Sequence, residues 1–150
     1  MRLHSHAIPR TAGFTLVELL IATSIAGVLA SVAYPTFAGA LRKVRRSDAL
    51  FAMLQLQTAR ERSRSGNVRY GTLAEVGIAS MAPGGNYLLS VTEPSPTGYV
   101  AFAQATGAQQ RDHECRHLSI AVESGDPTYR SGETGAAAND EPASRKCWNL

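Results

Sequence analysis

The sequence predicts an α+β protein in which one long N-terminal α-helix packs against a small antiparallel β-sheet. An almost uncharged apolar run near the N-terminus continues into a helical pattern that reaches residue 65. The apolar period then shifts from about 3.6 residues to 2, which indicates strands. With 150 residues, 44% of them hydrophobic and 18% charged, the chain can build one modest core and not two. The formal net charge of +3 permits contact with nucleic acid or anionic lipid without requiring either.

Residues 1–13 form a short basic leader that breaks the order of an ordinary secretory signal. The leader carries Arg2 and Arg10 and no acidic residue, which is typical of the cytoplasmic flank of an inserted helix. A secretory signal has its small-residue cleavage site after the apolar core. Here Gly13 precedes the apolar run, so cleavage after Gly13 would leave the whole run on the mature protein.

The apolar run covers residues 14–40 and contains one charged residue, Glu18. From residue 19 to residue 40 it is long enough to cross a hydrocarbon layer, which needs about 20 helical residues. A simple membrane anchor does not explain Glu18, because a carboxylate near the apolar core costs about 2.5–3.5 kcal/mol. Cleavage after Gly13 would create a protonated amine on Phe14, one helical turn away. The carboxylate could pair with that amine in its own chain or in a staggered neighbour, and the second pairing would set subunit register.

The basic leader, Gly13, the aromatic Phe14, the apolar run and Glu18 together resemble the class III signal of type IV pilins and pseudopilins. The resemblance implies the type IV pilin fold and cleavage between Gly13 and Phe14 by a prepilin peptidase, which also methylates the Phe14 amine. It implies storage in the inner membrane as a single-pass protein with a cytoplasmic N-terminus, surrounded by membrane lipid. An inner-membrane assembly platform would then polymerise the chain with other pilin subunits into an extracellular pilus.

The helix is expected to bend in its apolar half and to become amphipathic beyond it. Pro35 lies inside the helical pattern and lacks a backbone donor, which predicts a kink or local opening there. The resemblance to pilins implies that the region from Gly27 to Pro35 is where the packed helix can loosen in the filament. After residue 41, apolar residues occupy about half of the helical circumference and arginines the other half, so we expect an apolar buried face and a basic exposed face. The apolar face contains Val44, Leu50, Phe51, Met53 and Leu54, and the basic face contains Arg42, Arg45, Arg46, Arg60 and Arg64. Leu56 falls on the basic face and does not fit.

The helix is expected to end near Gly66, because glycine and asparagine offer the left-handed conformation that closes a helix. Alternating apolar residues then predict strands at residues 87–92, 99–105 and 118–123, arranged as an antiparallel meander. Beyond Gly125 the chain has little apolar periodicity and is predicted to be a loop until Cys147. The predicted organisation is a removed leader (1–13), a membrane and filament-core helix (14–40), an amphipathic helix (41–65) and a globular β domain (66–150).

The two cysteines, Cys115 and Cys147, can pair if the domain is exported. Their bridge would close a loop of about 33 residues and contribute about 3.5–4 kcal/mol by chain-entropy arithmetic. A disulfide loop over residues 115–147 resembles that of many pilins, most closely the small PilE-type and minor pilins. Two free buried cysteines are the alternative.

One further pattern in the sequence concerns metal binding. His113, Cys115 and His117 alternate and could hold a transition metal on one face of a strand, but the spacing provides no fourth ligand. No nucleophile lies on a tight turn beside a base, so we expect no enzymatic activity, no metal and no cofactor.

The resemblance therefore implies a structural subunit of a type IV pilus, minor or PilE-like, that serves adhesion, twitching motility or DNA uptake. A type II secretion pseudopilin is one alternative, and a minor pilin that acts as a DNA receptor for natural transformation is another. A receptor would contact nucleic acid phosphates through cations of the C-terminal region. The candidates are Arg111, Arg116, Arg145 and Lys146.

Overall fold

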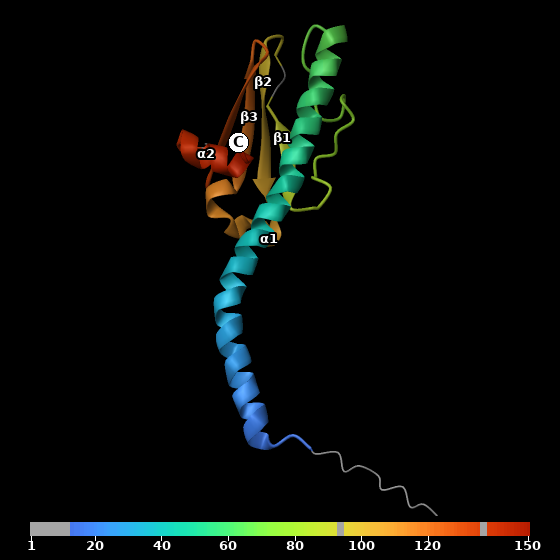
Figure 1. The fold of residues 1–150 in the computed structure, drawn as a ribbon. Helices are drawn as coiled ribbons and strands as arrows, with labels where there is room; N and C mark the ends of the chain where they lie inside the picture. The colour runs from blue at the N-terminus through green and yellow to red at the C-terminus, as the bar shows by residue number, and fades with distance from the viewer. Residues whose placement is uncertain (1–12, 93–94, 136–137) are drawn as a thin grey trace, which may run out of the picture. The chain divides into compact units, whose positions relative to one another are not determined.

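The computed structural model describes residues 13–92, 95–135 and 138–150. Its elements follow the chain as a long helix, four strands and a short C-terminal helix, with two 3-10 helices between the second and third strands (Figure 1). They are α1 (Leu16–Gly66), β1 (Tyr87–Val91), β2 (Gly98–Ala105), η1 (Gly107–Arg111), η2 (His113–Cys115), β3 (His117–Glu123), β4 (Asp126–Gly132) and α2 (Glu141–Trp148). The chain forms two compact units, of which one ends at Ala38 and the other spans Gly39–Leu150.

The described part of the N-terminal unit is the first stretch of α1 with the residues just before it. The large apolar side chains of this stretch are exposed, and α1 is long and apolar enough to cross a membrane. Gly27 and Pro35 lie inside α1, and the helical hydrogen-bonding pattern is assigned on both sides of each. The kink there, the membrane boundaries and the end of the leader stay predictions, and leader residues 1–12 lie outside the described residues.

The C-terminal unit contains one antiparallel meander with the strand order β1-β2-β3-β4. Residues that face the helix lie beside one another across the strands, as in the pairs Leu89 with Ala103 and Ile120 with Tyr129. The three predicted strands and the helix end at Gly66 are confirmed. Figure 1 shows the C-terminal part of α1 along the sheet, and the buried residues of both form one core.

The predicted loop after Gly125 is wrong, because β4 and α2 occupy most of it. Strand β4 pairs with β3 along its whole length. The residues on one face of β4 are Pro127, which is exposed, Tyr129, which is partly buried, and Ser131, which is buried, so the apolar alternation that marks a strand is missing. Helix α2 is short. Its N-terminus is capped by Asp140, whose side chain accepts a hydrogen bond from the Ala143 amide at 3.0 Å.

The buried face of α1 also differs from the prediction. It follows Arg46, Ala49, Met53, Leu56 and Arg60, which recur every three or four residues, so Leu56 fits and two arginines are buried. Val44, Phe51 and Leu54, which were expected in the core, are 68%, 58% and 48% exposed. The prediction was wrong because it placed every arginine outside, whereas a planar guanidinium on an apolar stem can be buried beside suitable partners.

Both edges of the sheet are covered within the C-terminal unit. The outer side of β1 is paired by the segment around Met81, where the Ala82 amide donates to the Tyr87 carbonyl at 2.9 Å. The outer side of β4 is filled from α2 and the residues before it. The Trp148 indole donates to the Arg130 carbonyl at 2.8 Å, the Ser131 amide donates to the Ser144 hydroxyl at 3.2 Å, and the Asn139 amide donates to the Ser131 carbonyl at 3.0 Å. These contacts occupy backbone groups that an edge strand otherwise presents to other chains.

Candidate assembly segment and nucleic-acid interface

The start of α1 holds Glu18 through a reciprocal pair of hydrogen bonds with Thr15. The Glu18 carboxylate accepts from the Thr15 amide at 2.9 Å and from its hydroxyl at 2.7 Å, while the Glu18 amide donates to the Thr15 hydroxyl at 3.2 Å. This is a capping box, which satisfies backbone donors of the first turn. The sequence interpretation gave Thr15 no role, although threonine three residues before glutamate is the signal of such a box. Gly13 and Phe14 precede the box and are exposed, with Phe14 at 86%.

Cys115 and Cys147 form the predicted disulfide, with their Cα atoms 5.5 Å apart. Both are fully buried, and the bridge joins η2 to α2. Cys115 is therefore committed to the bridge and not to a metal. The expected strand geometry of residues 113–117 is also wrong, because His113 and Cys115 lie in a 3-10 helix and His117 begins β3. Within the described residues, no group of three His, Cys, Asp or Glu side chains is arranged to hold a metal ion.

A buried polar network connects α1 to the segment that carries the disulfide. The Arg46 guanidinium donates to the Asp112 carboxylate from Nε at 3.1 Å, and the Gln109 side-chain amide donates to the same carboxylate at 3.1 Å. Gln109 also donates to the Tyr87 hydroxyl, which donates in turn to the Cys115 carbonyl at 3.2 Å. Burial raises the pKa of Tyr87 to about 12. The network thus connects α1, β1 and both 3-10 helices through buried hydrogen bonds.

A second buried cation, Arg60, is enclosed by aromatic rings. Its guanidinium carbon lies 4.0 Å from the ring centre of Tyr99 and 5.8 Å from that of Tyr70, and the two rings meet edge to face at 4.9 Å. Arg60 is fully buried, and its side-chain nitrogens have no hydrogen-bond acceptor among the described residues. Removal from water lowers its pKa. The contacts that favour the cation here are with aromatic faces.

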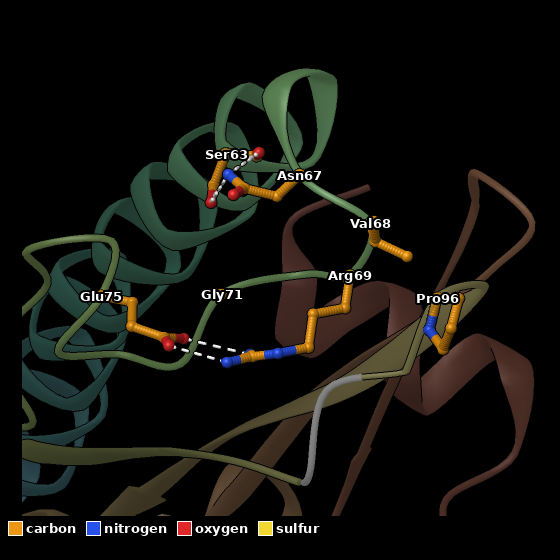
Figure 2. A pocket seen from close by; sticks show the side chains of 7 residues that line it. All are labelled: Ser63, Asn67, Val68, Arg69, Gly71, Glu75 and Pro96. Carbon is orange, nitrogen blue, oxygen red and sulfur yellow. Dashed lines mark hydrogen bonds and ion pairs between the residues drawn. The ribbon is translucent and has the colours of Figure 1, made fainter.

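A surface pocket of about 570 Å³ lies beside the C-terminal end of α1 (Figure 2). Arg69 and Glu75 face each other in it at 2.8 Å, and the Thr72 amide also donates to Glu75. The hydrogen bond from Arg69, followed by those from Thr72, lowers the pKa of Glu75 to about 2. The Asn67 side chain is likewise engaged with the Ser63 carbonyl at 2.7 Å. The polar groups Arg69, Glu75 and Asn67 in the pocket are therefore engaged in hydrogen bonds within the chain.

The four candidate DNA contacts lie in different electrostatic settings. Lys146 pairs with Glu114 at 2.7 Å, Arg116 lies 3.6 Å from Glu133, and Arg145 lies 4.0 Å from Glu141. Arg111, at the end of η1, is exposed and forms no ion pair with any described residue. Three of the four cations therefore have a carboxylate beside them.

Comparison with known proteins gives two family matches. Residues 35–119 match the family model described as "Type IV minor pilin ComP, DNA uptake sequence receptor", and residues 8–34 match the prokaryotic N-terminal methylation motif. Among curated proteins, the chain is 39% identical to the type IV major pilin protein PilA of Myxococcus xanthus over 72 residues, or 47% of its length. It is 30% identical to the type II secretion system core protein G of Pectobacterium carotovorum over 92 residues, or 61% of its length.

These alignments cover 33% of the PilA chain and 55% of the core protein G chain, so the chain spans about half or less of the curated relatives it matches. The minor-pilin match extends over more than half of this chain, from Pro35 through α1 and the first strands into β3. It agrees with the long N-terminal helix, the four-stranded antiparallel sheet and the C-terminal disulfide. The chain therefore belongs to the type IV minor pilin family that this match describes.

Proposed function

We propose that this chain is a structural subunit of a type IV pilus, stored in the inner membrane and then built into the filament through α1. The observation that carries the proposal is the start of α1, where an exposed Gly13-Phe14 pair precedes Glu18 and a long apolar helix surface. The match of residues 8–34 to the N-terminal methylation motif supports the same reading. In this role the N-terminus lies in the cytoplasm, a prepilin peptidase cuts after Gly13, and neighbouring subunits cover the apolar side chains.

The test of processing is the intact mass of the protein recovered from membranes. A mature chain that begins at Phe14 lacks Arg2 and Arg10, so its formal charge falls to 3 − 2 = +1. Gly13→Val should leave an uncut precursor, because the peptidase must approach this backbone closely. Gly27→Val is the matched control, since a side chain there meets no atom within 4 Å and lies beyond the cleavage site. A mature protein that begins elsewhere would contradict the proposal.

Filament type is decided separately, because the relatives include both a pilus subunit and a secretion-system protein. We expect an epitope-labelled chain to be found in pili sheared from the cell surface. Absence from sheared pili, together with loss of type II secretion when the chain is deleted, would assign it to a secretion pseudopilus instead.

A second candidate function is reception of DNA at the pilus. It is favoured by the description of the matched family, which names a DNA uptake sequence receptor. The matched segment includes Arg111 and Arg116 and ends before Arg145 and Lys146. Arg111 is the best candidate because it is exposed and has no ion pair among the described residues. An exposed cation without a neighbouring carboxylate can neutralise a phosphate at no cost in lost ion pairing.

The test is titration of the Gly39–Leu150 unit with duplex DNA between about 50 and 200 mM salt, where affinity should fall steeply as counterions are released. Arg111→Ala should weaken binding most. Lys146→Ala should weaken it least because Lys146 already pairs with Glu114. Binding that is indifferent to duplex sequence would indicate phosphate contacts alone. Weak binding that no single alanine change affects would exclude the receptor and leave the pilus subunit in place.

A further inference from the structure

We propose that the start of the C-terminal unit binds the anionic head groups of phospholipids through four cations: Arg42, Lys43, Arg45 and Arg111. These residues are called the basic collar below. The inference rests on the membrane-stored stage of the proposed function, and the ligand is the phosphate surface of the bilayer that holds the apolar helix.

Three elements of the fold meet at the basic collar. The Gln109 side chain on η1 donates to the Arg42 carbonyl at 3.2 Å, so η1 lies against this turn of α1, and Arg111 follows two residues later. The Arg46 guanidinium donates to the Lys146 carbonyl at 3.3 Å, which brings the end of α2 to the same place. Cations that are distant in sequence are thereby held at one end of the C-terminal unit.

The four collar cations have no carboxylate within ion-pair distance among the described residues. The neighbouring Arg46 is neutralised by Asp112 at 3.0 Å, but none of the collar cations forms an ion pair with a described residue. Lys43 and Arg111 are exposed, and Arg42 and Arg45 are partly exposed. In the sequence, no acidic residue occurs between Glu18 and Asp48. The collar therefore offers several cationic donors to a ligand with phosphate oxygens.

Sequence position favours a membrane surface as that ligand. The collar begins two residues after Ala40, the last residue of the apolar run. With the N-terminus in the cytoplasm, this puts four cations at residues 42–46 on the outer side against two arginines in the leader. Such a distribution opposes the usual excess of Lys and Arg on the cytoplasmic side. Attraction to lipid phosphates offsets that opposition, because each Lys or Arg at an anionic membrane surface strengthens attachment by about fivefold.

The test uses the full chain in neutral detergent micelles that contain either phosphatidylglycerol or phosphatidylcholine at the same mole fraction. The readout is the thermal unfolding midpoint of the C-terminal unit. Unfolding is monitored by the near-ultraviolet circular dichroism of Trp148, which is buried in the folded chain. We expect phosphatidylglycerol to raise the midpoint and phosphatidylcholine to leave it unchanged, because a ligand of the native state stabilises that state. Glutamine at Arg42, Lys43 and Arg45 together should abolish the shift. Arg111→Gln alone should raise the half-effective phosphatidylglycerol fraction by about fivefold.

Arg62→Gln is the matched control, because Arg62 is an exposed α1 cation outside the collar with no ion pair among the described residues, and the shift should persist. If the triple variant unfolds without lipid, Lys43→Gln and Arg111→Gln carry the test, since both side chains are exposed.

Equal shifts in the wild type and all collar variants would overturn the proposal. So would an equal shift with inorganic phosphate, which would indicate a small-anion site, or a shift with short duplex DNA in place of lipid, which would indicate nucleic acid. Release of the wild-type chain from membranes by alkaline carbonate would refute membrane storage itself, whereas retention without lipid selectivity would refute only the collar.

Discussion

Arg46 on α1 and Asp112 between the two 3-10 helices form a buried ion pair, with Nη2 and Oδ2 3.0 Å apart and the two side chains 9% and 11% exposed. The residues are 66 positions apart in the chain, and Gln109 contributes a third member of the pair's hydrogen-bond network. The pair fixes how the segment before β3 packs on the helix. Because η2 also carries Cys115, this contact ties the disulfide to α1.

Removing one member of the Arg46–Asp112 pair should destabilise the domain strongly. Asp112→Ala leaves a buried guanidinium without its counter-charge, which costs about 3–5 kcal/mol of unfolding free energy. The double variant Arg46→Met/Asp112→Leu should lose much less, because it removes both charges. Urea denaturation of the Gly39–Leu150 unit measures the difference. Arg145→Ala, at an exposed pair 4.0 Å long, is the control and should change stability by less than about 1 kcal/mol. A similarly small effect of Asp112→Ala would contradict the network.

Because aromatic rings enclose Arg60, we expect the positive charge and the planar shape of its guanidinium to contribute differently to the stability of the domain. Arg60→Lys should cost about 2 kcal/mol or more, because an ammonium is compact, strongly hydrated and unable to stack on the Tyr99 ring. Arg60→Met should stay within about 1 kcal/mol of wild type, since it fills similar volume without a buried charge. The measurement is the unfolding free energy of each variant compared with that of the wild type. Lysine that is tolerated as well as arginine would mean that stacking contributes nothing.

Opening the disulfide should lower the free energy of unfolding by about 2–4 kcal/mol, and the melting temperature by several degrees. The expected cause is that the bridge, which links Cys115 to Cys147 in α2, restricts the unfolded chain and so makes unfolding less favourable. Calorimetry with and without reductant measures the change. The variant with serine at both cysteines should melt at the temperature of the reduced wild type and ignore reductant. Two titratable thiols in a properly exported sample would refute the bridge.

The lowered pKa of Glu75 predicts that the folded domain loses part of its stability when Glu75 is protonated at low pH. Its pKa is about 2 in the folded chain against an ordinary value of 4.5, so the unfolded chain binds the proton more readily. The stabilising contribution is therefore complete above about pH 5 and lost as pH falls toward 2. Glu75→Gln should lower the melting temperature near neutral pH, and the two curves should converge at about pH 2. Glu141→Gln, at the weak contact with Arg145, should leave the wild-type profile unchanged. Parallel profiles for the wild type and Glu75→Gln would contradict the assignment.

At the N-terminal end, Glu18→Val should insert into the membrane normally but enter pili poorly. Under the proposed function, valine removes a membrane-buried charge that the Phe14 amine of a neighbouring subunit neutralises. Glu18→Gln separates charge from local structure, because an amide oxygen can keep the hydrogen bonds from Thr15. If charge sets subunit register, both variants should be depleted from sheared pili by a similar factor. Depletion of the valine variant alone would assign the effect to the capping box, and normal incorporation of both would end the register argument.

The elements that the sequence predicted correctly have a periodic apolar signal of their own. Alternating apolar residues mark β1, β2 and β3. The start of α1 is marked by the apolar run, and its end is marked by Gly66. β4 escaped prediction because its order comes from pairing with β3, which lets proline, tyrosine and serine occupy one of its faces. Helix α2 escaped because it depends on the Asp140 cap and on the disulfide more than on an apolar stripe. Structure imposed by neighbours leaves little trace in a short stretch of sequence.

The polar sites show the same division. Gly13, Phe14 and Glu18 were singled out because a local motif carries them, and their roles in processing and assembly stay predictions. The cysteine pairing could be predicted because only two cysteines are present, and it is confirmed. The burial of Arg46 and Arg60 was missed, because their partners Asp112 and Tyr99 come from segments far along the chain. Gln109, which joins Asp112 to Tyr87, has no signal in its local sequence that would indicate these contacts.

The covered edge of β4 has a consequence for the order of events in the cell. A protein made to polymerise is exposed to a competing route, in which bare strand edges join at random and form insoluble aggregates. Here the outer side of β4 is closed by Trp148 and Ser144, and Cys147 fastens their helix to the domain. In a chain that reached the assembly machinery before the disulfide formed, the β4 edge would be incompletely covered, because α2 would not be fastened to the domain. Under the proposed function, forming the disulfide before assembly would keep the β4 edge covered and leave the exposed apolar surface of α1 for contacts between subunits.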